Sequence, residues 1–265
     1  MNRAGSPVLC QLQARVFIIT LNRPQRMNAI TGEISELLVA SINEAAANPD
    51  VGAVVLTGAG GSFCAGGDMS AISESAAETS AASDCAKVIA AALPVRLLID
   101  LPKPTIAMVR GAAAGGGLAL AAACDLRIAS NNALFTFAYT NIGLGGDFGV
   151  SYLLARLLGS ARAHEFCMLC PRIDAAESLR IGLVNRVVAD DQLEAVTYAI
   201  ASQLAAGPPL ALECIKRNLR AAVELPFNEA LTIEAENFVR CRSTHDHKEA
   251  VKAFIEKRLP EFTGH

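Results

Sequence analysis

The sequence predicts an α/β fold with a helical C-terminal region, and three observations support this prediction. Apolar, β-branched runs such as residues 16–21 and 53–57 are bounded by proline or glycine, as short buried strands are. Two glycine-rich segments, residues 62–68 and 111–117, each follow a strand-like run and end where a helix can begin. From about residue 192 onward the pattern favours helices alone.

The first elements alternate between strand and helix. Strands are predicted over residues 16–21 and 53–57. Between them Thr31 is suited to cap the start of a helix. The apolar positions of that helix recur at helical spacing and are Ile34, Leu37, Leu38 and Ile42.

The central part of the chain repeats a unit of strand, glycine turn and helix. Residues 105–109 are predicted to form a strand, and the Ala-rich residues 118–124 favour a helix after the triple glycine. Further strands are predicted over residues 126–129 and 134–137.

The C-terminal helices are separated by breaks at residues 207–209 and at Pro226. A soft boundary near residue 200 divides a core, residues 1–200, from a helical region, residues 201–265. No low-complexity linker separates the two, so the helical region is expected to pack on the core or on a neighbouring subunit.

Composition and charge exclude several classes of protein. With 23 Lys and Arg against 26 Asp and Glu, the net charge is -3, and the chain lacks the basic excess of a nucleic-acid binder. The longest uncharged apolar run, residues 111–124, is too short to cross a bilayer, and the first residues lack the apolar segment of a signal peptide. We expect a cytoplasmic protein with neither a membrane nor a nucleic acid as partner.

The eight cysteines are scattered, which favours reduced thiols over a disulfide framework. His164, Cys167 and Cys170 fall at helical spacing, but no second Cys or His pair follows. Core packing is the preferred interpretation, and no metal site is expected. A basic cluster on a predicted helix is either a solvated face or a contact for a phosphate; it comprises Lys216, Arg217 and Arg220.

The two glycine-rich segments suit the binding of an anion. Glycine allows a ligand to approach the backbone closely, and the start of a helix leaves N–H donors without partners at the positive end of its dipole. Two such segments can place two N–H groups around one oxygen. We therefore predict a site that holds an oxyanion.

Four segments, taken together, carry a resemblance. They are Leu21-Asn22-Arg23-Pro24 with Asn28-Ala29-Ile30, Ser62-Phe63-Cys64-Ala65-Gly66-Gly67-Asp68, Gly111 through Gly117 with Cys124-Asp125, and Ala253-Phe254-Ile255-Glu256-Lys257-Arg258. In this order and at these spacings they closely resemble the enoyl-CoA hydratase/isomerase (crotonase) superfamily. The resemblance covers almost the whole chain.

The resemblance implies a crotonase-like spiral of strand-strand-helix turns, with C-terminal helices that build a homotrimer or a dimer of trimers. It also implies an acyl-CoA thioester substrate, whose carbonyl oxygen accepts hydrogen bonds from the backbone N–H groups of Gly67 and Gly116. Coenzyme A is then part of the substrate, and no separate cofactor is expected.

The resemblance further implies which residues contact the substrate and its coenzyme A. The residues implied near the adenine are Arg26, Met27, Ala65 and Asp68, and the final helix, often that of the next subunit, adds Phe254 and Lys257. Met69, Gly115 and Tyr139 complete the set. Asp68 is equally suited to cap a helix, and Lys257 to be a solvated charge.

Two positions depart from the pattern of the family's hydratases. Those proteins usually carry two glutamates where this chain has Ala119 and Tyr139. Alanine cannot transfer a proton, and a tyrosine with an ordinary pKa near 10 is a poor base at neutral pH. Ordinary hydration with two glutamates is therefore not expected.

Asp147 is the carboxylate that the chain offers instead. Its segment, residues 142–149, resembles family members that isomerise acyl-CoAs through one aspartate, and also aryl-CoA dehalogenases, which add a histidine and a tryptophan; this chain has no Trp. To act as a base, Asp147 needs a raised pKa, for which an apolar wall of Phe137, Tyr139 and Phe148 is required. The alternative is that Asp147 caps a helix predicted over residues 150–158.

We favour double-bond isomerisation of an enoyl-CoA, with Gly67 and Gly116 holding the enolate oxygen and Asp147 moving the proton. An enoyl-CoA hydratase and a non-catalytic acyl-CoA binder are the alternatives.

Overall fold

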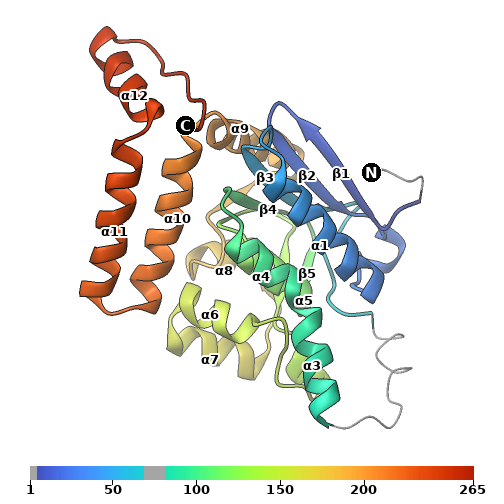
Figure 1. Cartoon of the computed structure of the whole chain (residues 1–265). Helices are drawn as coiled ribbons and strands as arrows, with labels where there is room; N and C mark the ends of the chain where they lie inside the picture. The colour runs from blue at the N-terminus through green and yellow to red at the C-terminus, as the bar shows by residue number, and fades with distance from the viewer. Residues whose placement is uncertain (1–4, 69–80) are drawn as a thin grey trace.

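Two β-sheets form the centre of the fold in the computed structural model, which describes residues 5–68 and 81–265 (Figure 1). The larger sheet has six strands in the order β1-β2-β3-β4-β6-β9. They are β1 (Val8–Gln13), β2 (Val16–Leu21), β3 (Ala53–Gly58), β4 (Thr105–Val109), β6 (Leu126–Ser130) and β9 (Arg186–Val188). Strand β1 is antiparallel to β2, and every later pair of neighbours is parallel.

The smaller sheet has three short strands in the order β5-β7-β8. Strand β5 (Ala112–Ala114) is parallel to β7 (Leu134–Thr136), which is antiparallel to β8 (Ile173–Asp174). Helix α5 (Gly116–Ala123) begins two residues after β5 ends. The second glycine-rich segment therefore joins the smaller sheet to a buried helix.

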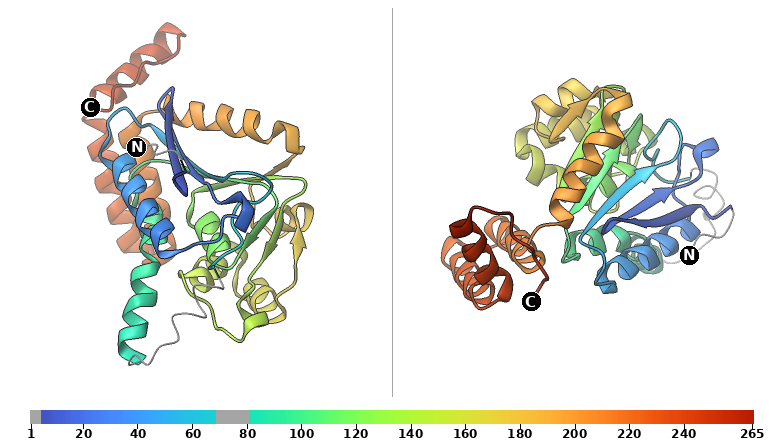
Figure 2. Two further views of the ribbon diagram at one scale, coloured as in Figure 1. Left: turned by 90° about the vertical axis from the view of Figure 1, so that its right-hand side faces the viewer. Right: turned by 90° about the horizontal axis from the view of Figure 1, so that it is seen from above.

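Helices cover both faces of the larger sheet (Figure 2). On one face α1 (Gly32–Ala47), α4 (Leu93–Asp100) and α5 share a core with strand residues such as Ile19 and Leu56. On the other face α9 (Leu193–Ala205) packs on residues such as Ile18 and Val55. Because successive strand residues point to opposite faces, and both faces are covered, the central parallel strands are mostly apolar.

The remaining elements of the core are short. They are η1 (Pro24–Arg26), α3 (Ala81–Ala91), η2 (Tyr139–Ile142), α6 (Val150–Leu158), α7 (Ser160–Leu169), α8 (Ala175–Arg180) and η3 (Asp190–Gln192).

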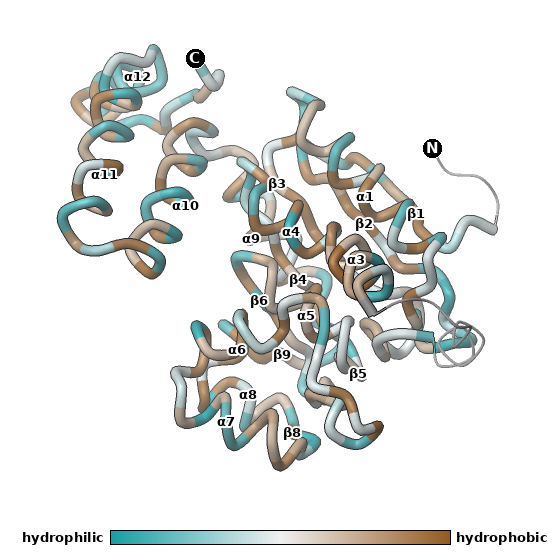
Figure 3. Tube along the Cα trace, turned by 60° about the horizontal axis from the view of Figure 1, so that its bottom comes forward, coloured by the Kyte–Doolittle hydropathy of each residue, from teal (hydrophilic) through white to brown (hydrophobic). Residues whose placement is uncertain are grey.

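The last three helices form a layer of their own beside the core (Figures 1 and 2). They are α10 (Pro209–Glu224), α11 (Phe227–Arg242) and α12 (His245–Glu256). Figure 3 shows hydrophobic and hydrophilic residues alternating along α10 and α11. Within residues 5–68 and 81–265 no helix combines the length and the apolar character needed to cross a bilayer.

Most elements predicted from the sequence are present. Strands β2, β3, β4 and β6 match the predicted ranges to within about a residue, and Thr31 caps α1 by accepting a hydrogen bond from the Ile34 N–H at 3.3 Å. Strand β7 confirms the strand predicted over residues 134–137. Strand β1 was not predicted, because its exposed Gln11 and Gln13 interrupt the apolar pattern, and neither were the very short strands β5, β8 and β9. Helix α9 spans the predicted boundary near residue 200 and packs on the larger sheet.

Close backbone packing between the two glycine-rich segments can be tested at Gly117. A Cβ at this position would lie 2.2 Å from the Cys64 carbonyl oxygen, so we predict that Gly117→Ala lowers the free energy of unfolding by about 1–3 kcal/mol. Urea unfolding measures this change. Gly61→Ala is the control, since its Cβ meets no atom within 4 Å. Equal stability of the two variants would contradict the close packing.

Candidate functional site

The two glycine-rich segments lie side by side because their backbones pair. The Cys64 N–H donates to the Ala112 carbonyl oxygen at 2.9 Å, and the Ala114 N–H donates to the Cys64 carbonyl oxygen at 3.0 Å. Gly66 has a φ of +95°, and a Cβ there would lie 3.5 Å from the Gly116 nitrogen. The turn at Gly66 thus brings the backbone of the first segment to the start of α5.

Two backbone N–H groups of these segments have no acceptor among the described residues. Gly116 is the first residue of α5, and the first helical hydrogen bond is that of Ala119 to the Gly115 carbonyl oxygen, 3.0 Å. The Ile30 backbone pairs with the Gly66 carbonyl oxygen and the Asp68 N–H, at 2.7 and 2.9 Å, which places the Gly67 N–H on the opposite edge. Within residues 5–68 and 81–265 neither the Gly67 nor the Gly116 N–H donates to another residue.

Both glycines line one cavity of about 220 Å³. Its described wall consists of glycines, apolar side chains and one tyrosine, and Asp147 is the charged residue among them. The lining residues are Ala65, Gly66, Gly67, Gly115, Gly116, Ala138, Tyr139, Ile142, Leu144, Asp147 and Phe148. The structure therefore brings together the three residues for which sequence analysis predicted chemistry: Gly67, Gly116 and Asp147.

The Asp147 carboxylate accepts a hydrogen bond from the Tyr139 hydroxyl. Burial raises the pKa of Asp147, while the hydrogen bond from Tyr139 opposes this effect. Burial raises the pKa of Tyr139 as well, and the neighbouring carboxylate adds to the increase, so the phenol stays neutral. Tyr139 and Phe148 were predicted at the site from the sequence, whereas the Tyr139–Asp147 hydrogen bond was not.

Asp147 does not cap the following helix, which corrects the alternative prediction for this residue. The N-cap of α6 is Gly149, and no side chain caps the helix. The physical reason is the left-handed backbone at Gly149, φ +68°, which turns the chain between Asp147 and α6.

Two non-glycine residues with left-handed backbones flank the Tyr139–Asp147 pair. Ala138 has a φ of 68° and Phe148 a φ of 53°. Such conformations are unfavourable for residues with a Cβ, and they are typical of functional sites. The Cys170 thiol supports the first, since its sulfur accepts a hydrogen bond from the Ala138 N–H at 3.1 Å.

The residues predicted near the adenine lie beside the first glycine-rich segment. Arg26 and Met27 are exposed, and the Met27 carbonyl oxygen accepts a hydrogen bond from the Ala65 N–H at 3.0 Å. The Asp68 carboxylate accepts two hydrogen bonds of 3.1 Å from Arg23. Arg23 was not predicted as a site residue, and the one sequence signal for it is its place in the segment that carries the resemblance.

Of the three remaining predicted contacts, the structure describes two, and neither lines this cavity. Met69 lies outside the described residues. Phe254, 85% exposed, and Lys257 belong to the end of α12, which Figures 1 and 2 place with the C-terminal helices, away from α5 of the same chain.

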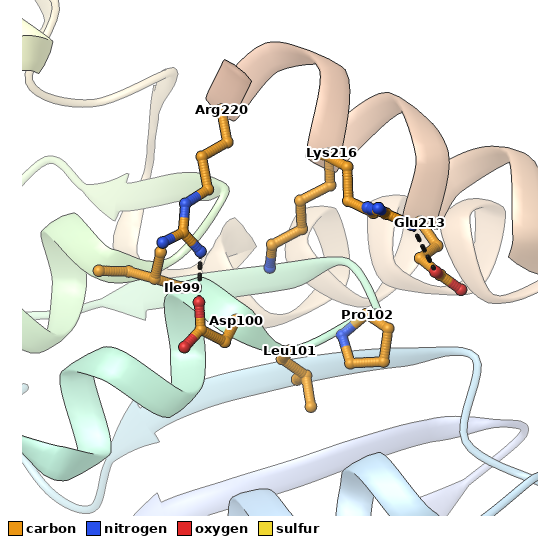
Figure 4. Close-up of a pocket in the computed structure, with 8 residues that line it drawn as sticks. Ile99, Asp100, Leu101, Pro102, Glu213, Lys216 and Arg220 are labelled. Atoms are coloured by element: carbon orange, nitrogen blue, oxygen red, sulfur yellow. Dashed lines mark hydrogen bonds and ion pairs between the residues drawn. The ribbon is translucent and has the colours of Figure 1, made fainter. Parts of the chain in front are cut away.

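The basic cluster on α10 faces a different cavity of about 360 Å³, between α10 and the end of α4 (Figure 4). Lys216 donates to Asp125 at 2.9 Å, and Arg220 pairs with Asp100. Carboxylates thus already balance these cations, and the cluster joins the C-terminal helices to the core. Within residues 5–68 and 81–265 no cluster of three His, Cys, Asp or Glu side chains is arranged to hold a metal ion.

Comparisons with known proteins agree with this architecture. The family model described as enoyl-CoA hydratase/isomerase matches residues 11–265. This chain belongs to the enoyl-CoA hydratase/isomerase family. It has the crotonase fold with a C-terminal helical region, as the resemblance implied, and its substrates are acyl-CoA thioesters.

Relatives of this hydratase/isomerase-family protein carry the names of different reactions. The short-chain-enoyl-CoA hydratase of Clostridium acetobutylicum is 36% identical over 255 residues, 96% of each chain. The 1,2-epoxyphenylacetyl-CoA isomerase of Escherichia coli K12 is 33% identical over 97% of this chain and 98% of its own. A solved enoyl-CoA hydratase from Polaromonas sp. JS666 is 35% identical with a TM-score of 0.91, over 96% of this chain and 99% of that one.

The surroundings of Asp147 predict its titration. Because burial raises its pKa, we expect the carboxyl group to titrate above the ordinary aspartate value of about 3.9. Carboxyl ¹³C NMR measures this, with the signal assigned by its absence from Asp147→Asn. As the pH falls, Asp147 should be protonated before a fully exposed aspartate is. Titration at or below the ordinary value would contradict the buried environment.

Proposed function

We propose that this protein isomerises the double bond of an enoyl-CoA, with two backbone N–H groups holding the thioester oxygen and Asp147 transferring the proton. The observation that supports the proposal is the meeting of Gly67, Gly116 and Asp147 around one cavity. Two N–H donors, for which the described part of the chain offers no acceptor, and one carboxylate are the groups that enolate chemistry requires.

The N–H groups of Gly67 and Gly116 would stabilise the charge that forms during the reaction. Removal of a proton from the carbon next to the thioester carbonyl moves negative charge onto the carbonyl oxygen. Fixed N–H donors in a site with little water stabilise this charge, and the loss of one such donor typically costs about 2.7–4 kcal/mol. The positive end of the α5 dipole adds to the effect at Gly116.

Asp147 would act first as base and then as acid. Its ionised carboxylate takes the proton from the α-carbon of a β,γ-enoyl-CoA, which gives a dienolate. The protonated Asp147 then returns the proton to the γ-carbon, so the double bond moves by one position and the carboxylate is ionised again. One carboxyl group suffices for both steps, which agrees with the buried Ala119 on α5.

The composition of the cavity wall favours an uncharged acyl group as the substrate. Ile142, Leu144 and Phe148 present apolar side chains to it, and the described lining includes no basic residue that would bind a second carboxylate. We place the coenzyme A moiety beside Ala65, with Asp68, Arg26 and Met27 near the adenine. Met69 belongs to the same proposed contact.

The C-terminal helices would complete the site in an oligomer. Phe254 and Lys257 lie away from the cavity of their own chain, and their exposure supports a contact with the coenzyme A bound to a neighbouring subunit. We propose a homotrimer or a dimer of trimers, with coenzyme A as part of the substrate and no separate cofactor.

Asp147→Asn tests the proposal. We expect it to lower the turnover of 3-hexenoyl-CoA about 10²- to 10⁴-fold, because an amide cannot take up the proton. The affinity for hexanoyl-CoA should stay nearly unchanged. A coupled absorbance assay and calorimetry measure the two quantities. Asp50→Asn, at an exposed aspartate, is the control. Unchanged turnover would remove Asp147 from the mechanism.

Hydration is the second candidate because the names of the similar relatives favour it. Mass spectrometry of products formed in H₂¹⁸O separates the two reactions. Isomerisation predicts a product with the mass of the substrate and a shifted double bond. A product heavier by one labelled water would establish hydration instead, and binding without any product would indicate a non-catalytic acyl-CoA binder.

A further inference from the structure

Tyr139 is placed to control the carboxylate on which the proposed function rests. Tyr139 is the first residue of η2, and it is buried, with 7% of its surface exposed. The hydroxyl donates to Oδ1 of Asp147, eight residues further along the chain. The ring also lies close to the second glycine-rich segment, since a Cβ at Gly115 would be 3.7 Å from the Tyr139 hydroxyl oxygen.

Packing fixes the Tyr139 ring and the Asp147 loop against the same side chain. The rings of Phe137 and Tyr139 pack edge to face, with centroids 5.0 Å apart and an angle of 60°. A Cβ at Gly146, the residue before Asp147, would lie 3.1 Å from the tip of the Phe137 ring. Phe137 therefore holds the donor and the acceptor of the hydrogen bond in register.

The hydrogen bond makes the two carboxylate oxygens of Asp147 different. Oδ1 is held by Tyr139, and within residues 5–68 and 81–265 no hydrogen bond to Oδ2 is found. Oδ2 is then the oxygen available to a substrate proton in the cavity. Without the tyrosine hydroxyl, rotation about the Cβ–Cγ bond would no longer be restrained by a hydrogen bond.

We propose that Tyr139 is a positioning residue that fixes the Asp147 carboxylate by its hydroxyl and keeps one carboxylate oxygen free for proton transfer. This inference rests on the proposed role of Asp147. Tyr139 does not itself transfer a proton in this scheme, because its phenol stays neutral and its hydroxyl donates its hydrogen bond to the carboxylate. It takes a position at which the family's hydratases usually have a glutamate, but it acts through Asp147.

The charges around the pair give the inference a pH-dependent consequence. Burial raises the pKa of Asp147, and the hydrogen bond from Tyr139 lowers it. In the described part of the chain the buried Cys64 thiol is the other titratable group that acts on Tyr139, and Tyr139 is the one that acts on Asp147. Burial raises the pKa of Cys64 to about 12, so this thiol is neutral at the pH values of interest.

Tyr139→Phe tests the inference, because it removes the hydroxyl and keeps the ring that packs on Phe137. We expect the Asp147 carboxyl signal to titrate at a higher pH in the variant than in the unmodified protein, by ¹³C NMR. With 3-hexenoyl-CoA, kcat should fall about ten- to a hundredfold, the size expected for the loss of one hydrogen bond to a charged group, while KM stays nearly constant. The acidic limb of the kcat profile should move to higher pH with the carboxyl titration.

Tyr152→Phe is the matched control, since its hydroxyl also donates to a carboxylate, that of Glu224, at 2.9 Å on the surface. It should leave both the Asp147 titration and kcat unchanged. If Tyr139→Phe leaves both the Asp147 titration and kcat as they are in the unmodified protein, the inference is overturned, even if Asp147→Asn is inactive. An active Asp147→Asn would overturn the proposed function itself, and the NMR titration would still decide whether Tyr139 sets the pKa.

Discussion

The backbone pairing of Cys64 with β5 is the contact on which the site depends. It holds together the two glycine-rich segments, which are almost fifty residues apart in the sequence. Their backbones approach so closely that a side chain would not fit between them. A Cβ at Gly117 would lie 2.2 Å from the Cys64 carbonyl oxygen, and one at Gly66 would lie 2.9 Å from that of Ala114. Glycine is required at these places by the approach of backbone to backbone, and the Gly67 and Gly116 N–H groups meet at one cavity as a consequence.

The second constraint is a carboxylate in an apolar wall. Removing a charge from water is unfavourable, and here the hydrogen bond from Tyr139 and the partial exposure of Asp147 offset part of that cost. The left-handed backbones of Ala138 and Phe148 add strain on both sides of the pair. The Cys170 thiol supports the conformation of Ala138, because its sulfur accepts a hydrogen bond from the Ala138 N–H.

Local sequence features predicted those parts of the molecule that local physics decides. The Thr31 cap, the apolar central strands and the helix after the triple glycine depend on neighbouring residues, and the structure confirms all three. Gly67 and Gly116 could be predicted as a pair because the family's motif fixes both positions.

Contacts set by the path of a loop could not be predicted in this way. The Tyr139–Asp147 hydrogen bond depends on several positive φ angles between and beside the two residues, and the Arg23–Asp68 pair joins residues 45 apart. The helix-cap interpretation of Asp147 failed for the same reason, since the turn at Gly149 separates this residue from α6. The proposed contact of Phe254 and Lys257 with coenzyme A depends on a neighbouring subunit, whose position local sequence features do not determine.

A crystal structure of the Asp147→Asn variant with bound 3-hexenoyl-CoA would show where the thioester lies. We expect a thioester carbonyl oxygen about 2.7–3.1 Å from the backbone nitrogens of both Gly67 and Gly116, with the α-carbon facing residue 147. A carbonyl oxygen bound by neither nitrogen, or an acyl group outside the cavity, would contradict it.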